Sequence, residues 1–200
     1  MDFLETVNRK IEENRAEMVS SLSKLISIPS VAIEGSGTAT FGEGVDRAYR
    51  FMLEKAEGDG FETFDADGYG GHIDYDGEED GIVGIIGHLD VEPYSGAVIT
   101  DEETGREVIW GRGTMDDKGP VTASYYAMKA LKDCGFRPDR TIRLILGLDE
   151  ETNWHGMEYY GEHVGDYPDM GFTPDADFPV INAEMGILIF DMIRKLPASR

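Results

Sequence analysis

Two residues that could bind a cation come directly after an apolar stretch of this chain. Residues 81–87 are Gly, Ile and Val without polar alternation, which predicts a strand covered on both faces, and His88 and Asp90 follow it. Open α/β sheets bind ligands at the carboxyl ends of their strands. A carboxylate beside a metal-binding histidine fixes the tautomer and orientation of the ring. His88 is therefore a candidate ligand with Asp90 as its orienting partner, although a lone histidine at a strand end is more often structural.

Further acids follow other apolar or glycine-rich segments. Asp116 and Asp117 lie in a glycine-rich loop before a predicted helix, where they could hold a cation or only stabilise the helix N-terminus. Glu150 and Glu151 follow a second strongly apolar stretch, and Asp175 comes in a later loop. These nitrogen and oxygen donors suit a metal site better than a nucleophile. A paired-metal site also needs a free carboxylate as base, and adjacent glutamates cannot easily serve the same ion, which predicts different roles for the two.

Composition narrows the classes of partner and site. The 200 residues, 40% of them hydrophobic, are enough to bury the core of one domain. The net charge of −22 argues against nucleic-acid and anionic-membrane partners. The chain has a single cysteine, Cys134, so a zinc site made of thiolates is excluded. Cys134 itself is expected to be a core residue. The charged amino terminus has no signal-peptide pattern and no apolar run is long enough to span a bilayer, so a cytoplasmic protein is predicted.

Alternating helices and apolar strands predict an α/β fold. Apolar residues at spacings of three, four and seven predict helices over 2–28, 45–56 and 121–134, and more weakly over 152–164. Strands are expected at 61–65, 72–75, 81–87, 140–148, 178–182 and 187–193. This order predicts a three-layer sandwich with a mostly parallel central sheet and helices on both faces.

Four motifs occur in the order that one enzyme family shows. They are GHLDV (87–91), GRGTMDDKGP (111–120), DEETNWHG (149–156) and TPDADFP (173–179). Together they resemble the successive motifs of the co-catalytic zinc metallopeptidases, which include glutamate carboxypeptidase, aminoacylase and succinyl-diaminopimelate desuccinylase. The EETNW segment and the pair Tyr159 and Tyr160 are most similar to bacterial Xaa-His dipeptidases of the PepV type. The resemblance covers essentially the whole chain.

The resemblance implies a ligand set for a first zinc ion. His88 would bind this ion, and Asp90 would orient the imidazole. Asp116 would bridge two ions, and Asp175 would complete the ligands of the first. Asp177, two residues further on, is the competing choice for that last position.

The resemblance also gives the two glutamates separate roles. Glu151 would bind the second zinc ion, and Glu150 would be the general base that takes a proton from a metal-activated water and passes it to the leaving amine. In the family the second ion's remaining ligand is a histidine near the carboxyl terminus of a longer chain. The other histidines of this chain, His72, His155 and His163, are expected to be surface or structural residues.

The family's lid domain and late histidine have no counterpart in these residues. Residues 1–200 are therefore expected to form the amino-terminal part of a zinc dipeptidase catalytic domain, incomplete and by itself inactive. Its substrates would be short peptides. An N-acyl amino acid or succinyl amidohydrolase is the alternative within the family, and a non-catalytic metal-binding domain is the alternative outside it. Cobalt or manganese suits the same donors as zinc, and a homodimer is expected only for a full-length protein, since family dimers use the lid.

Overall fold

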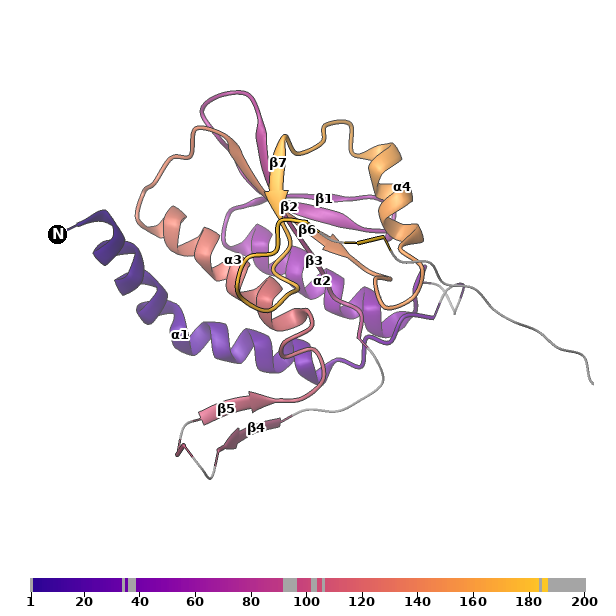
Figure 1. Cartoon of the computed structure of the whole chain (residues 1–200), viewed down its shortest axis with the longest axis horizontal. Coiled ribbons are helices and arrows are strands. Elements are labelled where there is room, and N and C mark those ends of the chain that lie inside the picture. Colours follow the sequence, from indigo (N-terminus) through magenta and orange to yellow (C-terminus); the bar gives the residue numbers. More distant parts are fainter. Residues whose placement is uncertain are drawn as a thin grey trace, which may run out of the picture.

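The computed structural model describes residues 2–33, 35, 39–91, 97–101, 104–105, 107–183 and 185–186. Figure 1 shows the order of the elements along the chain. Within the described residues the helices are α1 (Phe3–Ser27), α2 (Glu43–Gly58), α3 (Lys118–Asp133) and α4 (His155–His163). The strands are β1 (Glu62–Asp65), β2 (Gly71–Tyr75), β3 (Ile82–His88), β4 (Ala97–Thr100), β5 (Glu107–Trp110), β6 (Thr141–Gly147) and β7 (Met170–Phe172).

Five of the strands form one mixed sheet in the order β1-β2-β6-β3-β7. The pairings β6–β3 and β3–β7 are parallel, whereas β1–β2 and β2–β6 are antiparallel. The α/β class is confirmed, but the expectation of a mostly parallel sheet holds only for the half around β3. In the parallel pairing His88 lies opposite Gly147, so the carboxyl ends of β3 and β6 are side by side.

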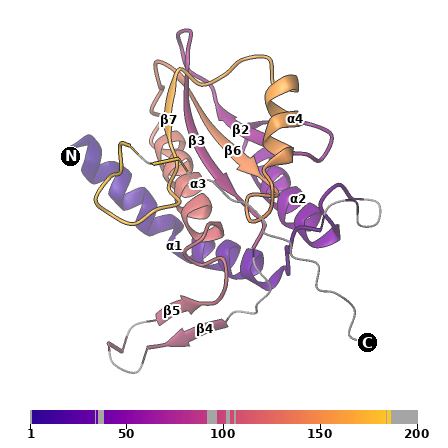
Figure 2. The same ribbon diagram turned by 45° about the vertical axis from the view of Figure 1, so that its right-hand side comes forward.

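Helices cover both faces of this sheet, as Figures 1 and 2 show from two directions. α2 and α3 pack on one face, where their apolar residues join Ile73, Leu144 and Leu146 in the main core. α1 packs along α3. α4 lies on the other face, where Tyr160 packs with Ile145. The three layers therefore agree with the predicted sandwich.

The apolar patterns of the first two helices account for their packing. α2 buries residues spaced by three and four, which is the face that its sequence predicts: Val45, Ala48, Tyr49, Met52, Leu53 and Ala56. α1 begins with a capping box between Asp2 and Glu5. It ends at Ser27, two residues before Pro29, which disfavours helical backbone in the residue that precedes it.

The end of the described chain differs from the prediction. Residues 178–182 do not form a strand: Pro179 cannot donate to a ladder, and Phe178 and Val180 are 92% and 82% exposed. The sheet ends instead at β7, a strand of three residues that is too short to give a sequence pattern. The predicted strand at 187–193 lies outside the described residues.

A hairpin of β4 and β5 lies apart from the main sheet, below α1 in both views (Figures 1 and 2). The sequence patterns did not predict it. Among the described helices, none combines the length and the apolar composition that a membrane crossing requires.

Candidate metal centre

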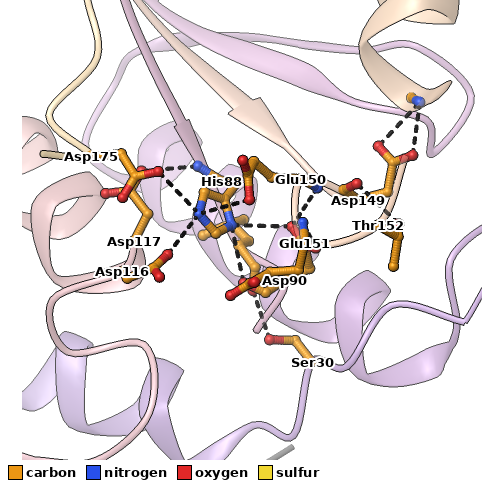
Figure 3. A network of polar contacts seen from close by, with 12 residues as sticks. Ser30, His88, Asp90, Asp116, Asp117, Asp149, Glu150, Glu151, Thr152 and Asp175 are labelled. Atoms are coloured by element: carbon orange, nitrogen blue, oxygen red, sulfur yellow. Dashed lines mark hydrogen bonds and ion pairs between the residues drawn. The ribbon is translucent and has the colours of Figure 1, made fainter. Parts of the chain in front are cut away.

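Three predicted ligands from distant parts of the chain meet at the carboxyl end of β3. His88 is the last residue of that strand, Asp116 lies in the loop before α3, and Asp175 follows β7. His88 Nε2 lies 3.1 Å from Asp116 Oδ1 and 3.7 Å from Asp175 Oδ2. One ligand atom from each residue lies within 4.8 Å of the others, and Figure 3 shows both aspartates on one side of the imidazole. A single cation could contact all three side chains.

Asp90 connects the histidine to the loop that carries the two glutamates. Its carboxylate is fully buried and accepts a hydrogen bond from His88 Nδ1 at 3.2 Å. Because the carboxylate only accepts, Nδ1 carries the proton and Nε2 is left to bind a cation. The same carboxylate accepts the backbone N–H groups of Glu150 and Glu151 at 3.1 and 3.0 Å. One buried group thus fixes the position of the imidazole and of the loop after β6.

The electrostatic surroundings of His88 favour a positive charge. Burial lowers the pKa of His88, but the hydrogen bond and charge of Asp90, together with the charges of Asp117 and Glu150, outweigh burial and raise the pKa to about 9. A bound cation would take the place of this proton, since a ligating imidazole must be neutral. The same surroundings would favour a cation bound at Nε2.

Asp117 supports the same strand end from the other side and is fully buried. Its Oδ2 accepts the backbone N–H of His88 at 3.0 Å. This approach requires glycine at position 87, because a Cβ there would collide with the Asp117 carboxylate and with Val121. Asp117 occupies the N-cap position of α3 but its side chain makes no capping hydrogen bond. Burial raises the pKa of Asp117 to about 7, and Oδ1 is buried without a hydrogen-bond partner among the described residues.

The two adjacent glutamates have different neighbours. Glu150 Oε2 lies 3.9 Å from His88 Nε2, near the three ligands but outside their group. Glu151 also lies outside that group, and its Oε1 is 3.5 Å from Arg112 Nη2. That oxygen is buried and makes no hydrogen bond within the described part of the chain. The two glutamates therefore differ in their surroundings, and their separate roles stay a prediction.

Arg112 is a site residue that the motifs did not single out. It lies in the loop between β5 and α3, flanked by Gly111 and Gly113, and forms an ion pair with Glu151. An arginine between two glycines in a loop that supplies a ligand is a weak sequence signal, because its partner is almost forty positions away. The structure shows it as the cation next to Glu151.

The other candidates lie outside the cluster. Asp177 is exposed and is not part of the three-residue group, so the geometry favours Asp175 over it. His72 is buried against Tyr160 beneath α4, and His155 and His163 are exposed at the two ends of that helix. Cys134, predicted in the core, is half-buried at the C-cap of α3.

The donor set fits a divalent cation such as zinc, cobalt or manganese. It consists of one imidazole nitrogen and carboxylate oxygens, which these ions all accept. Burial, together with the surrounding carboxylates, raises the pKa values of Glu150, Glu151 and Asp175. Two buried carboxylate oxygens of the site, on Asp117 and Glu151, have no hydrogen-bond partner within the described chain. A cluster with this excess of negative charge is stabilised by a cation.

Comparison with known proteins gives the family. The sequence profile of Peptidase family M20/M25/M40 matches residues 84–193, which is more than half of the chain and includes every residue of the cluster. The chain belongs to this peptidase family. It is 40% identical over 186 residues to a putative dipeptidase, YtjP, of Bacillus subtilis, and 39% identical over 188 residues to the Beta-Ala-Xaa dipeptidase of Lactobacillus delbrueckii. The expected resemblance is thereby confirmed.

The M20 relatives are much longer than this chain. Each of the two dipeptidase matches covers 90% of the chain but 39% of the relative. Among solved structures, the di-peptidase Dug1p of Saccharomyces cerevisiae gives a TM-score of 0.68 at 20% identity, covering 86% of this chain and 40% of that one. Human carnosine dipeptidase 1 gives 0.65 at 23% identity, covering 81% and 38%. These two structures show the same fold over about two fifths of their length.

Proposed function

We propose that residues 1–200 form the amino-terminal part of the catalytic domain of a zinc-dependent dipeptidase, and that they hold the ligands of one cation without further protein. The observation that carries this proposal is the convergence of His88, Asp116 and Asp175, with Glu150 beside them but outside their group. A structural metal site has no need of a free carboxylate next to its ligands. The arrangement therefore favours hydrolysis over a purely structural role.

In this proposal His88, Asp116 and Asp175 hold the first cation, and Asp116 and Glu151 contribute to a second in a complete enzyme. When bound, the cations lower the pKa of a water molecule and polarise the substrate carbonyl. Asp90 keeps the proton of the imidazole on Nδ1, so that Nε2 remains a ligand. Arg112 offsets the charge of Glu151.

Glu150 is the proposed general base. Its carboxylate is about two-thirds buried, and burial raises its pKa, which makes the group better at accepting a proton and passing it on. The proton comes from the attacking water and goes to the nitrogen of the leaving amine. The backbone N–H of Glu150 is held by Asp90, which limits where the carboxylate can move.

Short peptides are the proposed substrates, because the relatives that match most of this chain are named as dipeptidases. The domain assignment for residues 1–200, with the lid and the rest of the catalytic domain lying elsewhere, is likewise a proposal that the 39% coverage supports. In a longer protein that contains these residues, hydrolysis of dipeptides but not of N-acetyl or N-succinyl amino acids would support this assignment. The reverse preference would place the enzyme with the amidohydrolases.

The proposal is tested by titrating the metal-free chain with Zn²⁺ in a calorimeter and assaying the product on dipeptides. We expect one tightly bound ion per chain and little turnover. Two tight ions with substantial turnover would contradict the assignment as an incomplete domain. Failure to bind any divalent cation would contradict the metal centre itself.

A further inference from the structure

Lys118 is a buried charged residue to which the proposed reaction gives no role. It follows Asp117 directly, starts α3, and is 1% exposed. Its Nζ donates to the carbonyl oxygens of Leu25 at 2.8 Å and Ile28 at 2.9 Å, at the C-terminal end of α1.

A cation suits this end of α1 for two physical reasons. The last carbonyl groups of a helix lack intrahelical partners, and the helix dipole places partial negative charge there. Hydrogen bonds from a charged donor are also the stronger ones. Lys118 therefore fastens the loop that carries Asp116 to the end of a helix of 25 residues.

The same end of α1 is fastened to the loop that carries the histidine. Ser30 is fully buried; its Oγ donates to the carbonyl oxygen of Leu89 at 2.6 Å, and its own carbonyl accepts the N–H of Val91 at 3.0 Å. These two residues flank Asp90. Figure 3 shows Ser30 next to the polar network of the site. Residues 25–30 thus contact both ligand-bearing loops, which are separate in the sequence.

The loop after β3 and the loop before α3 also pack closely against each other. Gly113 has a φ of 84°, and a Cβ at that position would lie 3.0 Å from Val91 and 3.1 Å from the Lys118 side chain. The loop before α3 therefore packs, at Gly113, against both Val91 of the loop after β3 and the Lys118 side chain. A shift of either loop would change the distance between His88 and Asp116.

We propose that Lys118 and Ser30 are positioning residues that set the spacing of the cation ligands by joining both ligand loops to the C-terminal end of α1. This inference rests on the proposed metal centre. It gives α1, which lies outside the region matched by the family profile, a part in cation binding. A role in stability alone would leave the affinity and geometry of the bound ion unchanged in any variant that still folds.

The test measures Co²⁺ binding and the visible absorption of the bound ion, at a temperature well below unfolding, for Lys118→Met and Ser30→Ala. The controls are Lys129→Met, which removes another partly buried lysine of α3, and Ser23→Ala, which removes another α1 hydroxyl bonded to a backbone carbonyl. We expect Lys118→Met to weaken Co²⁺ binding about tenfold or more, which is typical when a residue that holds a metal ligand in place is lost. Ser30→Ala should weaken it less, and both should alter the spectrum, whereas the controls should match the unsubstituted chain.

A folded Lys118→Met chain with the affinity and spectrum of the Lys129→Met control would overturn the inference, even if its unfolding temperature fell. If Lys118→Met does not fold, Ser30→Ala decides: binding and absorption equal to those of Ser23→Ala would overturn it. If the unsubstituted chain binds no Co²⁺, the metal centre fails and the positioning role fails with it. The two failures are distinguishable because the second appears before any substitution is made.

Discussion

Two buried histidines of the same sheet, on β2 and β3, lie in similar local sequences but have different surroundings. His72 lies in GHIDY and His88 in GHLDV, so each follows a glycine and precedes an aspartate by two positions. Their side chains are 9% and 1% exposed. Among the described residues, carboxylates of four acids lie within 4 Å of the His88 ring, whereas His72 has one such neighbour, Asp74, at 3.5 Å.

The difference comes from what each aspartate contacts. Asp74 pairs across the strands with Arg143, whose Nε and Nη2 donate to it at 2.9 and 2.7 Å. Asp90 instead accepts two backbone N–H groups and the ring of His88. Burial lowers the pKa of His72 to about 4, while the acids around His88 raise its pKa to about 9. Burial alone therefore gives a neutral structural histidine, and a cation site also needs converging carboxylates.

The largest expected effect follows from removing each histidine in turn. Loss of a residue that only orients a ligand typically weakens metal binding ~10–100-fold. His88→Ala should weaken Co²⁺ binding by more than this, because it removes a proposed ligand. His72→Ala should leave Co²⁺ affinity unchanged and lower the free energy of unfolding. Calorimetric titration and urea unfolding of both variants check this. Equal loss of Co²⁺ binding in the two variants would contradict the contrast between the sites.

Substitutions of Asp90 and Asp74 should likewise differ in their effects on Co²⁺ affinity and on stability. Asp90→Asn should lower Co²⁺ affinity by about 10–100-fold, because it disturbs the imidazole and the glutamate loop together. Asp74→Asn should leave affinity unchanged but destabilise the fold by about 3 kcal/mol, since it leaves the buried Arg143 without its counter-ion. Titration and denaturant unfolding of both variants measure the two quantities. An Asp90→Asn chain that binds Co²⁺ normally would show that Asp90 does not orient the ligand.

The pH dependence of stability should reveal His72. Its pKa is about 4 in the folded chain against an ordinary value of 6.5, so the unfolded chain takes up the proton first as pH falls. The stabilising effect of the neutral ring is therefore complete above pH 6.5 and is lost between pH 6.5 and 4, by at most about 1.4 kcal/mol per pH unit. Urea unfolding across this range should show a shallower slope for His72→Asn. The exposed control His163→Asn should keep the original slope, and identical slopes in both variants would contradict the assignment.

Among the acidic residues of the site, Glu151 is expected to affect binding of the first ion least. Because Glu151 lies outside the group of three predicted ligands, Glu151→Gln should leave the affinity for the first Co²⁺ within about twofold of the unsubstituted chain. This is well below the change expected when a residue that orients a ligand is lost. Asp175→Asn should weaken binding strongly, as His88→Ala does, and Asp177→Asn should not change it. Titration of the three variants in parallel makes the comparison. A large loss with Glu151→Gln would move that residue into the first ligand set.

Sequence patterns located most of the helices and strands but did not indicate whether neighbouring strands are parallel or antiparallel. The apolar runs at 61–65, 72–75, 81–87 and 140–148 correspond to β1, β2, β3 and β6 within one or two residues. The antiparallel pairing of β2 with β6 could not be predicted, because the pattern of one strand does not specify the direction of its partner. β7 was not predicted, because three residues are too few to show an alternating pattern. The predicted strand at 178–182 was wrong because an apolar run that contains a proline was counted as a strand.

For the candidate site, the motifs include the three converging residues, His88, Asp116 and Asp175, but do not indicate which residues hold them in place. The family motifs include GHLDV, whereas the histidine of GHIDY, with a similar local pattern, is in no group of converging acids within the described part of the chain. Arg112, Lys118 and Ser30 contact residues 39 or more positions away, so spacing in the sequence gives no sign of these contacts. Such contacts depend on how the loops pack, which only the folded chain shows.

Anomalous diffraction from crystals of this chain grown with Co²⁺ tests the proposed metal centre most directly. We predict one strong peak per chain, bonded to His88 Nε2 and to carboxylate oxygens of Asp116 and Asp175, with no peak at His72. An ion bound elsewhere, or one that leaves any of these three side chains outside its coordination sphere, would contradict it.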